Sequence, residues 1–158
     1  MIQIIACGRV REKWMREGME EYAKRIRPYD RLTVIEAADE KARETNSDAE
    51  NRKVLKTEGE RLLRYVKDTD HMILLDLAGK PMDSVQLAQH IDCCRTAGKP
   101  VIDFVIGGSL GVSEDLIRRA DVRWKLSDNT FPHQLCRLLV LEQVYRSFRI
   151  LNHEPYHK

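Results

Sequence analysis

The sequence predicts one α/β domain, residues 1–158, with a mainly parallel sheet flanked by helices. Apolar runs typical of buried strands alternate with stretches of helical periodicity along the whole chain. A chain of 158 residues can bury a sizeable core and suits a single domain. The composition is 42% hydrophobic and 33% charged, which is ordinary for a globular protein, and no repeat or low-complexity linker divides it.

The first half of the chain predicts two strands and two helices. An isoleucine-rich run that stops at Gly8 predicts the first strand, and Pro28 marks the end of the following helix. Ser47 and Glu50 form a capping-box pattern that predicts the start of a second helix. The expected elements are a strand at Ile2–Cys7, a helix at Glu12–Tyr29, a strand at Leu32–Ala37, a charged loop at Asp39–Asn46 and a helix from Ser47 to about Lys67.

The second half repeats this alternation with more apolar strands. The segment HMILLDL has continuous apolar character, which predicts a central parallel strand covered on both faces. Asp83 is expected to begin a helix that ends at Gly98, a residue suited to a left-handed C-cap. The expected elements are a strand at His71–Leu77 followed by Ala78–Pro81, a helix from Asp83, a strand at Val101–Ile106, a glycine turn, a short helix, a short strand, a polar loop at Ser127–Pro132 and a helix at about His133–Ile150.

Several classes of protein are excluded by what the sequence lacks. No apolar run approaches the ~20 residues of a membrane span, and the N-terminus predicts a strand rather than a signal peptide, so a cytoplasmic protein is expected. The four cysteines include no C-x-x-C pair and are expected to be buried thiols; adjacent Cys93 and Cys94 would point about 100° apart on a helix. Structural roles are favoured for His71 and His90, and no metal is expected, because no His/Cys/Asp cluster has metal-ligand spacing.

Two loops in the second half are candidates for ligand binding. Gly107 and Gly108 directly follow a strand, and open α/β sheets bind ligands at the carboxyl ends of their strands. The glycines match neither a dinucleotide fingerprint nor a P-loop, and a tight packing turn explains them equally well. The polar loop before Pro132 precedes a helix N-terminus, where a ligand-holding loop or an ordinary helix cap is possible. Asp76 is either a partner for a ribose or an amine, or a solvated carboxylate.

The C-terminal region predicts an interface and a polar tail. The final helix is apolar on more than one side, which exceeds the stripe of a surface helix and predicts a two-fold homodimer. The last residues place Tyr156 beside His157, which favours either an ordinary frayed terminus or a tail that stacks on a base and assists proton transfer.

Four segments, HMILLDLAGKP, FVIGGSLG, LSDNTFPHQLCRLLVLEQVYRSF and the terminal PYHK, resemble the SPOUT class of methyltransferases. Within that class they are similar to the enzymes that methylate N3 of a pseudouridine in the RNA of the large ribosomal subunit. The resemblance covers essentially the whole chain. It implies an α/β fold with a C-terminal trefoil knot, S-adenosylmethionine as the methyl donor, the assembled ribosome as the substrate, and an active site that combines the cofactor loops of one subunit with the tail of the other.

The resemblance also implies which residues hold the methyl donor. Three segments are implicated: L-L-D, I-G-G and the polar loop, whose backbone groups would read the adenine edge. Lys-Met is common in the family where this chain has Asp128-Asn129. The implied cofactor-binding residues are Leu75, Gly107, Gly108, Leu126, Ser127, Asp128, Asn129, Thr130 and Phe131.

The chemistry of the implied reaction points to four further residues. The imide N3–H must lose a proton, so a base or an anion-stabilising cation would help. His157 or His133 is the candidate base, Arg137 the candidate cation, and Tyr156 a stacking or hydrogen-bonding partner for the substrate base.

The net charge of +2 does not by itself indicate binding to nucleic acid, so a local patch is needed. The most basic stretch is Arg9, Arg11, Lys13 and Arg16, for which a solvated helix face is an equally good interpretation. Two other functions stay open at this point: a SPOUT-like methyltransferase for another RNA base or a transfer RNA, and a non-catalytic ribosome-associated protein.

Overall fold

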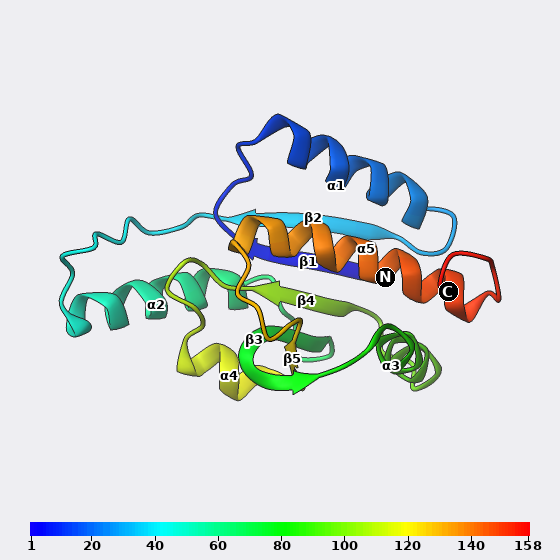
Figure 1. Cartoon of the computed structure of the whole chain (residues 1–158). Coiled ribbons are helices and arrows are strands. Elements are labelled where there is room, and N and C mark those ends of the chain that lie inside the picture. Colours follow the sequence, from blue (N-terminus) through cyan, green and yellow to red (C-terminus); the bar gives the residue numbers. More distant parts are fainter.

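Five apolar runs form one parallel sheet in the computed structural model, which describes residues Met1–Lys158. The strand order is β2-β1-β4-β3-β5, and every neighbouring pair is parallel (Figure 1). The predicted α/β class and the parallel sheet are therefore confirmed. The strands are β1 (Ile2–Cys7), β2 (Leu32–Ala37), β3 (His71–Pro81), β4 (Ile102–Ile106) and β5 (Val122–Lys125).

Four helices connect the strands and a fifth follows the last strand, and together they cover both faces of the sheet (Figure 1). One apolar core lies beneath α1, α3 and α5, and a smaller core lies beneath α2 and α4. The final helix packs against both α1 and α3, so it occupies the middle of its layer. The helices are α1 (Lys13–Ile26), α2 (Asp48–Leu63), α3 (Ser84–Thr96), α4 (Glu114–Arg119) and α5 (His133–Leu151).

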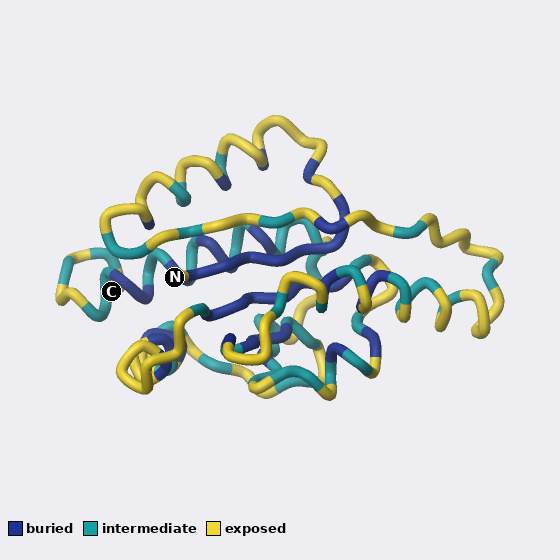
Figure 2. Tube along the Cα trace, turned by 180° about the vertical axis from the view of Figure 1, so that it is seen from behind, coloured by how far each residue is buried: buried dark blue, intermediate teal, exposed yellow.

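The strands β1 and β4 are buried along their whole length, as Figure 2 shows. The segment HMILLDL forms an interior parallel strand between β4 and β5, as its continuous apolar character predicts. Its apolar character arises because Ile73 contributes to one core and Met72 and Leu74 to the other.

The helix ends follow the local chemistry of the sequence. Both capping boxes form: Ser47 accepts a hydrogen bond from the backbone N–H of Glu50, and Asp83 accepts one from that of Gln86. Gly98 has a φ of +74°, as expected for a left-handed residue after a helix. α1 ends at Ile26, two residues before a proline, and α2 ends at Leu63, so both are shorter than the sequence predicts.

The strand β3 is longer than predicted and irregular. It continues through Ala78–Pro81, and its pairing with β5 shifts register, so that both Leu75 and Lys80 lie opposite Trp124. The residues between them form a bulge in this pairing. This bulge places Asp76 and Leu77 beside the loops that follow β4 and β5.

Candidate active site

A cavity of about 590 Å³ opens at the carboxyl ends of β3, β4 and β5. Four segments line it: the end of β3, the glycine turn after β4, the loop after β5 and the first turn of α5. Parallel strands present their carboxyl ends at one edge, so segments far apart in sequence converge there. The volume lies within the ~300–1,000 Å³ that is usual for sites that bind small molecules.

The glycine turn after β4 is required for packing and also lines the cavity. Gly111 has a φ of +101°, and its backbone N–H donates to the carbonyl of Gly108 at 3.2 Å. A Cβ at Gly107 would collide with the carbonyl of Gly111, and one at Gly108 would lie 2.6 Å from Oε2 of the buried Glu58. The two interpretations left open by the sequence are therefore compatible, because the same tight turn forms the wall of a ligand-sized space.

The polar loop after β5 contributes the opposite wall. Leu126, Ser127, Asn129, Thr130 and Phe131 all line the cavity. The Ser127 hydroxyl accepts the backbone N–H of Asn129 at 3.0 Å, which shapes the turn.

Asp128 is the one predicted cofactor residue that does not line the cavity. Its side chain is 92% exposed and forms an ion pair with Lys125 at 2.6 Å. The Asp128 side chain therefore lies in solvent and away from the cavity.

Asp76 lines the cavity, but its carboxylate already has partners. Oδ2 lies 2.6 Å from Nη2 of Arg123, and Oδ1 accepts the backbone N–H of Ala78 at 2.9 Å. The carboxylate is only 9% exposed, so it is not the solvated group that the sequence left possible. It holds the β3 bulge against β5.

His133 and Arg137 lie one turn apart on α5 but in different surroundings. His133 lines the cavity, and burial together with the Arg137 charge lowers the pKa of its imidazole. Arg137 is fully buried beneath the carboxyl ends of β1 and β2, where it lies 2.9 Å from Glu36 and donates to the carbonyl of Cys7. Arg137 thus anchors α5 to the sheet and does not line the cavity.

The C-terminal tail folds back on the far end of α5. The Tyr156 ring lies 4.7 Å from the guanidinium of Arg146, and its hydroxyl donates to Glu142 at 3.1 Å. His157 Nδ1 lies 3.4 Å from Arg146. Because a guanidinium only donates, Nδ1 is the accepting nitrogen in this contact. The tail is therefore held by side chains of α5 rather than frayed.

Tyr156 and His157 are brought together with each other but not with the cavity. Tyr156 contacts Glu142 and Arg146 in the second half of α5, and these residues lie about 14–20 Å along the helix from His133 at 1.5 Å per residue. The predicted residues thus form two groups within one subunit: the cofactor loops with His133 at the start of α5, and the tail beside its second half.

Other lining residues were not anticipated from the sequence. Trp124 contributes from β5, Val112 from the glycine turn and Cys136 from α5. Cys136 follows His133 by three residues, so helical periodicity could have indicated that both face the same way. The position of Trp124 depends on the β3–β5 register, which local patterns do not reveal. No helix has both the length and the apolar character that crossing a membrane requires.

Comparison with known proteins assigns the family. Residues 1–157 match the family described as predicted SPOUT methyltransferase. The chain is 48% identical to ribosomal RNA large subunit methyltransferase H of Desulfitobacterium hafniense, over 99% of this chain and 98% of that protein. It is 46% identical to the protein of the same name from Acetivibrio thermocellus, over 99% of both chains.

A solved structure shares the fold at low sequence identity. A probable methylase family protein from Haemophilus influenzae Rd superimposes with a TM-score of 0.53 at 11% identity, over 99% of this chain and 70% of that one. This likeness supports the architecture alone, whereas the matches at 46–48% identity support membership. The chain therefore belongs to the SPOUT methyltransferase family, together with the ribosomal RNA large subunit methyltransferases H.

Proposed function

We propose that this protein transfers a methyl group from S-adenosylmethionine to N3 of a pseudouridine in large-subunit ribosomal RNA, on the assembled ribosome and as a homodimer. The family and the names of the relatives support a methyltransferase for this class of RNA. The observation that carries the proposal is the cavity, because eight of the nine residues that the family resemblance implies for the methyl donor line it.

The lining suits an S-adenosylmethionine molecule. Leu75, Leu126 and Phe131 offer apolar surface for an adenine ring. The turns at 107–111 and 126–131 bring backbone amides and carbonyls to the same space, and such groups can read a base edge whatever their side chains are. The donor, when bound, supplies a methyl group already activated by its sulfonium.

The chain's own residues then position the base and move one proton. Holding N3 in line with the methyl group supplies most of the rate enhancement. His133 has a lowered pKa, so its imidazole is neutral near pH 7 and can accept the N3 proton. The pKa of Tyr156 is raised by burial and by its neighbours, so its phenol stays protonated and can donate to or stack on the base. The tail His157 is the alternative proton acceptor.

In a homodimer, the tail of one subunit can reach the cavity of the other. Within one chain Tyr156 lies beside Glu142 and Arg146 in the second half of α5, whereas His133 is the first residue of this helix. A two-fold partner whose α5 runs antiparallel to this one would bring its tail to the cavity. No residue of α5 is fully exposed, yet Leu135, Leu138 and Leu139 are only half-buried, which leaves apolar area for such a partner.

Part of the basic stretch lies at the same edge of the sheet as the cavity. Arg9 and Arg11 lie in the loop after β1, and the carboxyl end of this strand points toward the same edge of the sheet as the cavity. Both side chains are exposed and lack an ion-pair partner. We assign them to phosphate contacts, which makes binding to the ribosome salt-dependent.

Two measurements test the reaction. Calorimetry should show saturable binding of S-adenosylmethionine, and the absence of binding would leave a non-catalytic ribosome-associated protein. Ribosomes from a strain that lacks the gene should then become methylated when they are incubated with the purified protein and labelled S-adenosylmethionine. Mass mapping should place it on N3 of a pseudouridine; a methyl group on another base or on transfer RNA would contradict the assignment.

The shared site predicts that two inactive variants complement each other. A chain that lacks Tyr156–Lys158 should bind the methyl donor but not transfer the methyl group, and Gly107→Val should block the cavity but keep its tail. Mixed and refolded in equal amounts, they should recover about a quarter of wild-type activity, because half the dimers contain one complete site. Full activity of the truncated chain, or no recovery in mixtures shown to contain heterodimers, would contradict the shared site.

A further inference from the structure

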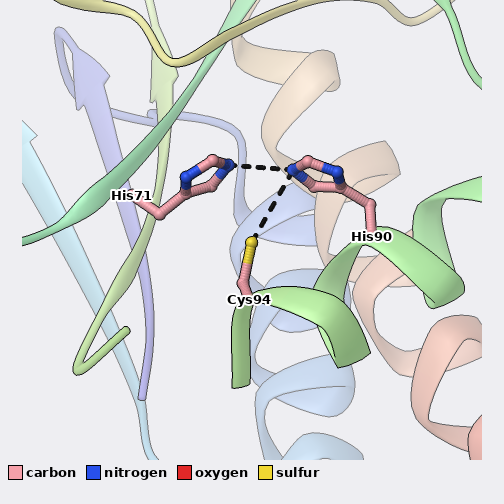
Figure 3. Close-up of side chains that lie close together, drawn as sticks. All are labelled: His71, His90 and Cys94. Atoms are coloured by element: carbon pink, nitrogen blue, oxygen red, sulfur yellow. Dashed lines mark hydrogen bonds between the residues drawn. The ribbon is translucent and has the colours of Figure 1, made fainter. Parts of the chain in front are cut away.

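Two histidines and a cysteine converge on the side of β3 that faces α3 (Figure 3). His71 is the first residue of β3, and His90 and Cys94 lie one turn apart on α3. Residues four apart on a helix share a face, so the second imidazole and the thiol point the same way. Figure 3 shows the His71 ring directed at the His90 ring, with the thiol of Cys94 beside it.

The ligand atoms lie close to the spacing that a tetrahedral ion requires. The two Nε2 atoms are 2.8 Å apart, Sγ of Cys94 is 3.7 Å from Nε2 of His90, and one ligand atom from each residue lies within 4.8 Å of the others. Around Zn²⁺, with about 2.05 Å to nitrogen and 2.3 Å to sulfur, tetrahedral geometry places nitrogens about 3.3 Å apart and nitrogen and sulfur about 3.6 Å apart. If the two imidazole rings move about 0.5 Å further apart, the nitrogen–nitrogen distance matches this geometry, and the nitrogen–sulfur distance already does.

The surroundings supply two further parts of a metal site. Oδ2 of Asp121 lies 3.8 Å from Nδ1 of His71, and it is held in place by the backbone N–H of Met72 at 2.8 Å and by Arg119 at 3.1 Å. A carboxylate facing the second ring nitrogen orients a metal-bound histidine. His90 and Asp121 also line a separate cavity of about 650 Å³, from which water can reach the cluster.

We propose that His71, His90 and Cys94 bind one Zn²⁺ ion through two Nε2 atoms and a thiolate, with water from this cavity as the fourth ligand. The mixed nitrogen and sulfur donor set favours Zn²⁺ over Mg²⁺ or Ca²⁺, which prefer oxygen. Binding releases the thiol proton of Cys94 to solvent. The ion ties the start of β3 to α3. It lies about 13 Å along β3 from Leu75 of the other cavity, so it stabilises the fold and takes no part in methyl transfer.

Cobalt and zinc titrations of the tag-free chain, stripped with a chelator, test this site. Co²⁺ should produce a thiolate-to-metal charge-transfer band and the intense visible bands of tetrahedral coordination, saturating at one equivalent, and Zn²⁺ should displace it. Cys94→Ser should abolish the charge-transfer band, while Cys93→Ser, the exposed neighbouring thiol, should keep it. Asp121→Asn should weaken binding about 10- to 100-fold. A band that is absent, or that survives Cys94→Ser, would overturn the site.

Two measurements on the unaltered chain do not depend on how the variants fold. X-ray absorption of the zinc-loaded protein should show one sulfur at about 2.3 Å and two imidazole nitrogens at about 2.0–2.1 Å. A shell of oxygens alone would refute the proposal. At a hundredfold excess of Zn²⁺ over its Kd, the Tm should rise by about 5–10 °C. Binding of S-adenosylmethionine should be unchanged; a zinc requirement for it would contradict the separation of the two sites.

Discussion

At the scale of single residues, Asp103 is the most unusual side chain of the core. It is fully buried on β4, and neither carboxylate oxygen has a hydrogen-bond partner. Burial, together with the nearby Asp70 carboxylate, raises the pKa of Asp103 from 3.8 to about 7. A buried carboxylate without a hydrogen-bond partner and close to a second carboxylate favours its neutral form, so the folded chain retains the proton on Asp103.

This raised pKa predicts how stability depends on pH. In the folded chain Asp103 keeps its proton up to about pH 7, whereas in the unfolded chain it loses it near pH 3.8. The contribution of this proton to the free energy of unfolding is thus complete below pH 3.8 and is lost as the pH rises to about 7. Asp103→Asn should therefore stabilise the protein by about 3 kcal/mol more at pH 8 than at pH 5. Urea unfolding of the wild-type and Asp103→Asn proteins at pH 5 and pH 8 measures this effect. If the variant and the wild type differ in their free energy of unfolding by the same amount at both pH values, the shifted pKa is contradicted.

At the scale of the elements, α2 and α4 approach each other at Gly59. A Cβ at this position would overlap the hydroxyl of Ser113, which caps α4 by accepting the backbone N–H of Leu116. The preceding residue, Glu58, lies against Gly108 of the cavity wall. The contact between these two helices therefore positions the glycine turn that carries the proposed cofactor site.

Gly59→Ala is expected to destabilise the protein by about 1–3 kcal/mol, because the methyl group must displace Ser113. Gly18→Ala is the matched control: it also lies in a helix, but its Cβ would meet only the flexible tip of Leu138 at 3.2 Å, so its effect should stay within about 1 kcal/mol of zero. In a double-mutant cycle, Ser113→Ala should recover part of the loss at Gly59. Equal effects of the two glycine substitutions would contradict the role of this contact.

At the scale of the whole molecule, the path of the last helix matters most. β5 lies at one edge of the sheet, and α5 returns from it across the face to pack on α1 and α3 (Figure 1). We propose that this return threads through a loop and forms the trefoil knot that the family resemblance implies, an exception to the usual rule against threaded chains.

A knot predicts a limit to how far the chain can be stretched. When both termini are pulled in a single-molecule experiment, an unknotted chain should reach about 3.3–3.6 Å per residue. A knotted chain should stop measurably short of this length, because the tightened knot retains residues. A truncated control that ends before α5 cannot contain the threaded segment and should extend fully. Full extension of the complete chain would refute the knot.

Much of the fold and of the candidate site follows from the sequence alone. The alternation of apolar runs and helical periodicity predicts the α/β class, and the capping boxes at Ser47 and Asp83 predict where two helices begin, because these signals act between residues close in sequence. The glycine turn and the polar loop are predicted from their positions after strands to be candidates for ligand binding, and in the structure both line the same cavity.

Only the tertiary structure decided how side chains far apart in sequence are paired. It placed Arg137 in an ion pair with Glu36, 101 residues away, instead of at the cavity, and it placed Tyr156 beside Glu142 and Arg146 in the second half of α5 instead of near His133. It also brought His71 to His90 and Cys94, where the sequence predicted no metal ligands. The spacing of His90 and Cys94 is visible in the sequence, but their third partner depends on which strand lies beside α3. Strand order and register decide such contacts, and they depend on the packing of the whole sheet rather than on any local pattern.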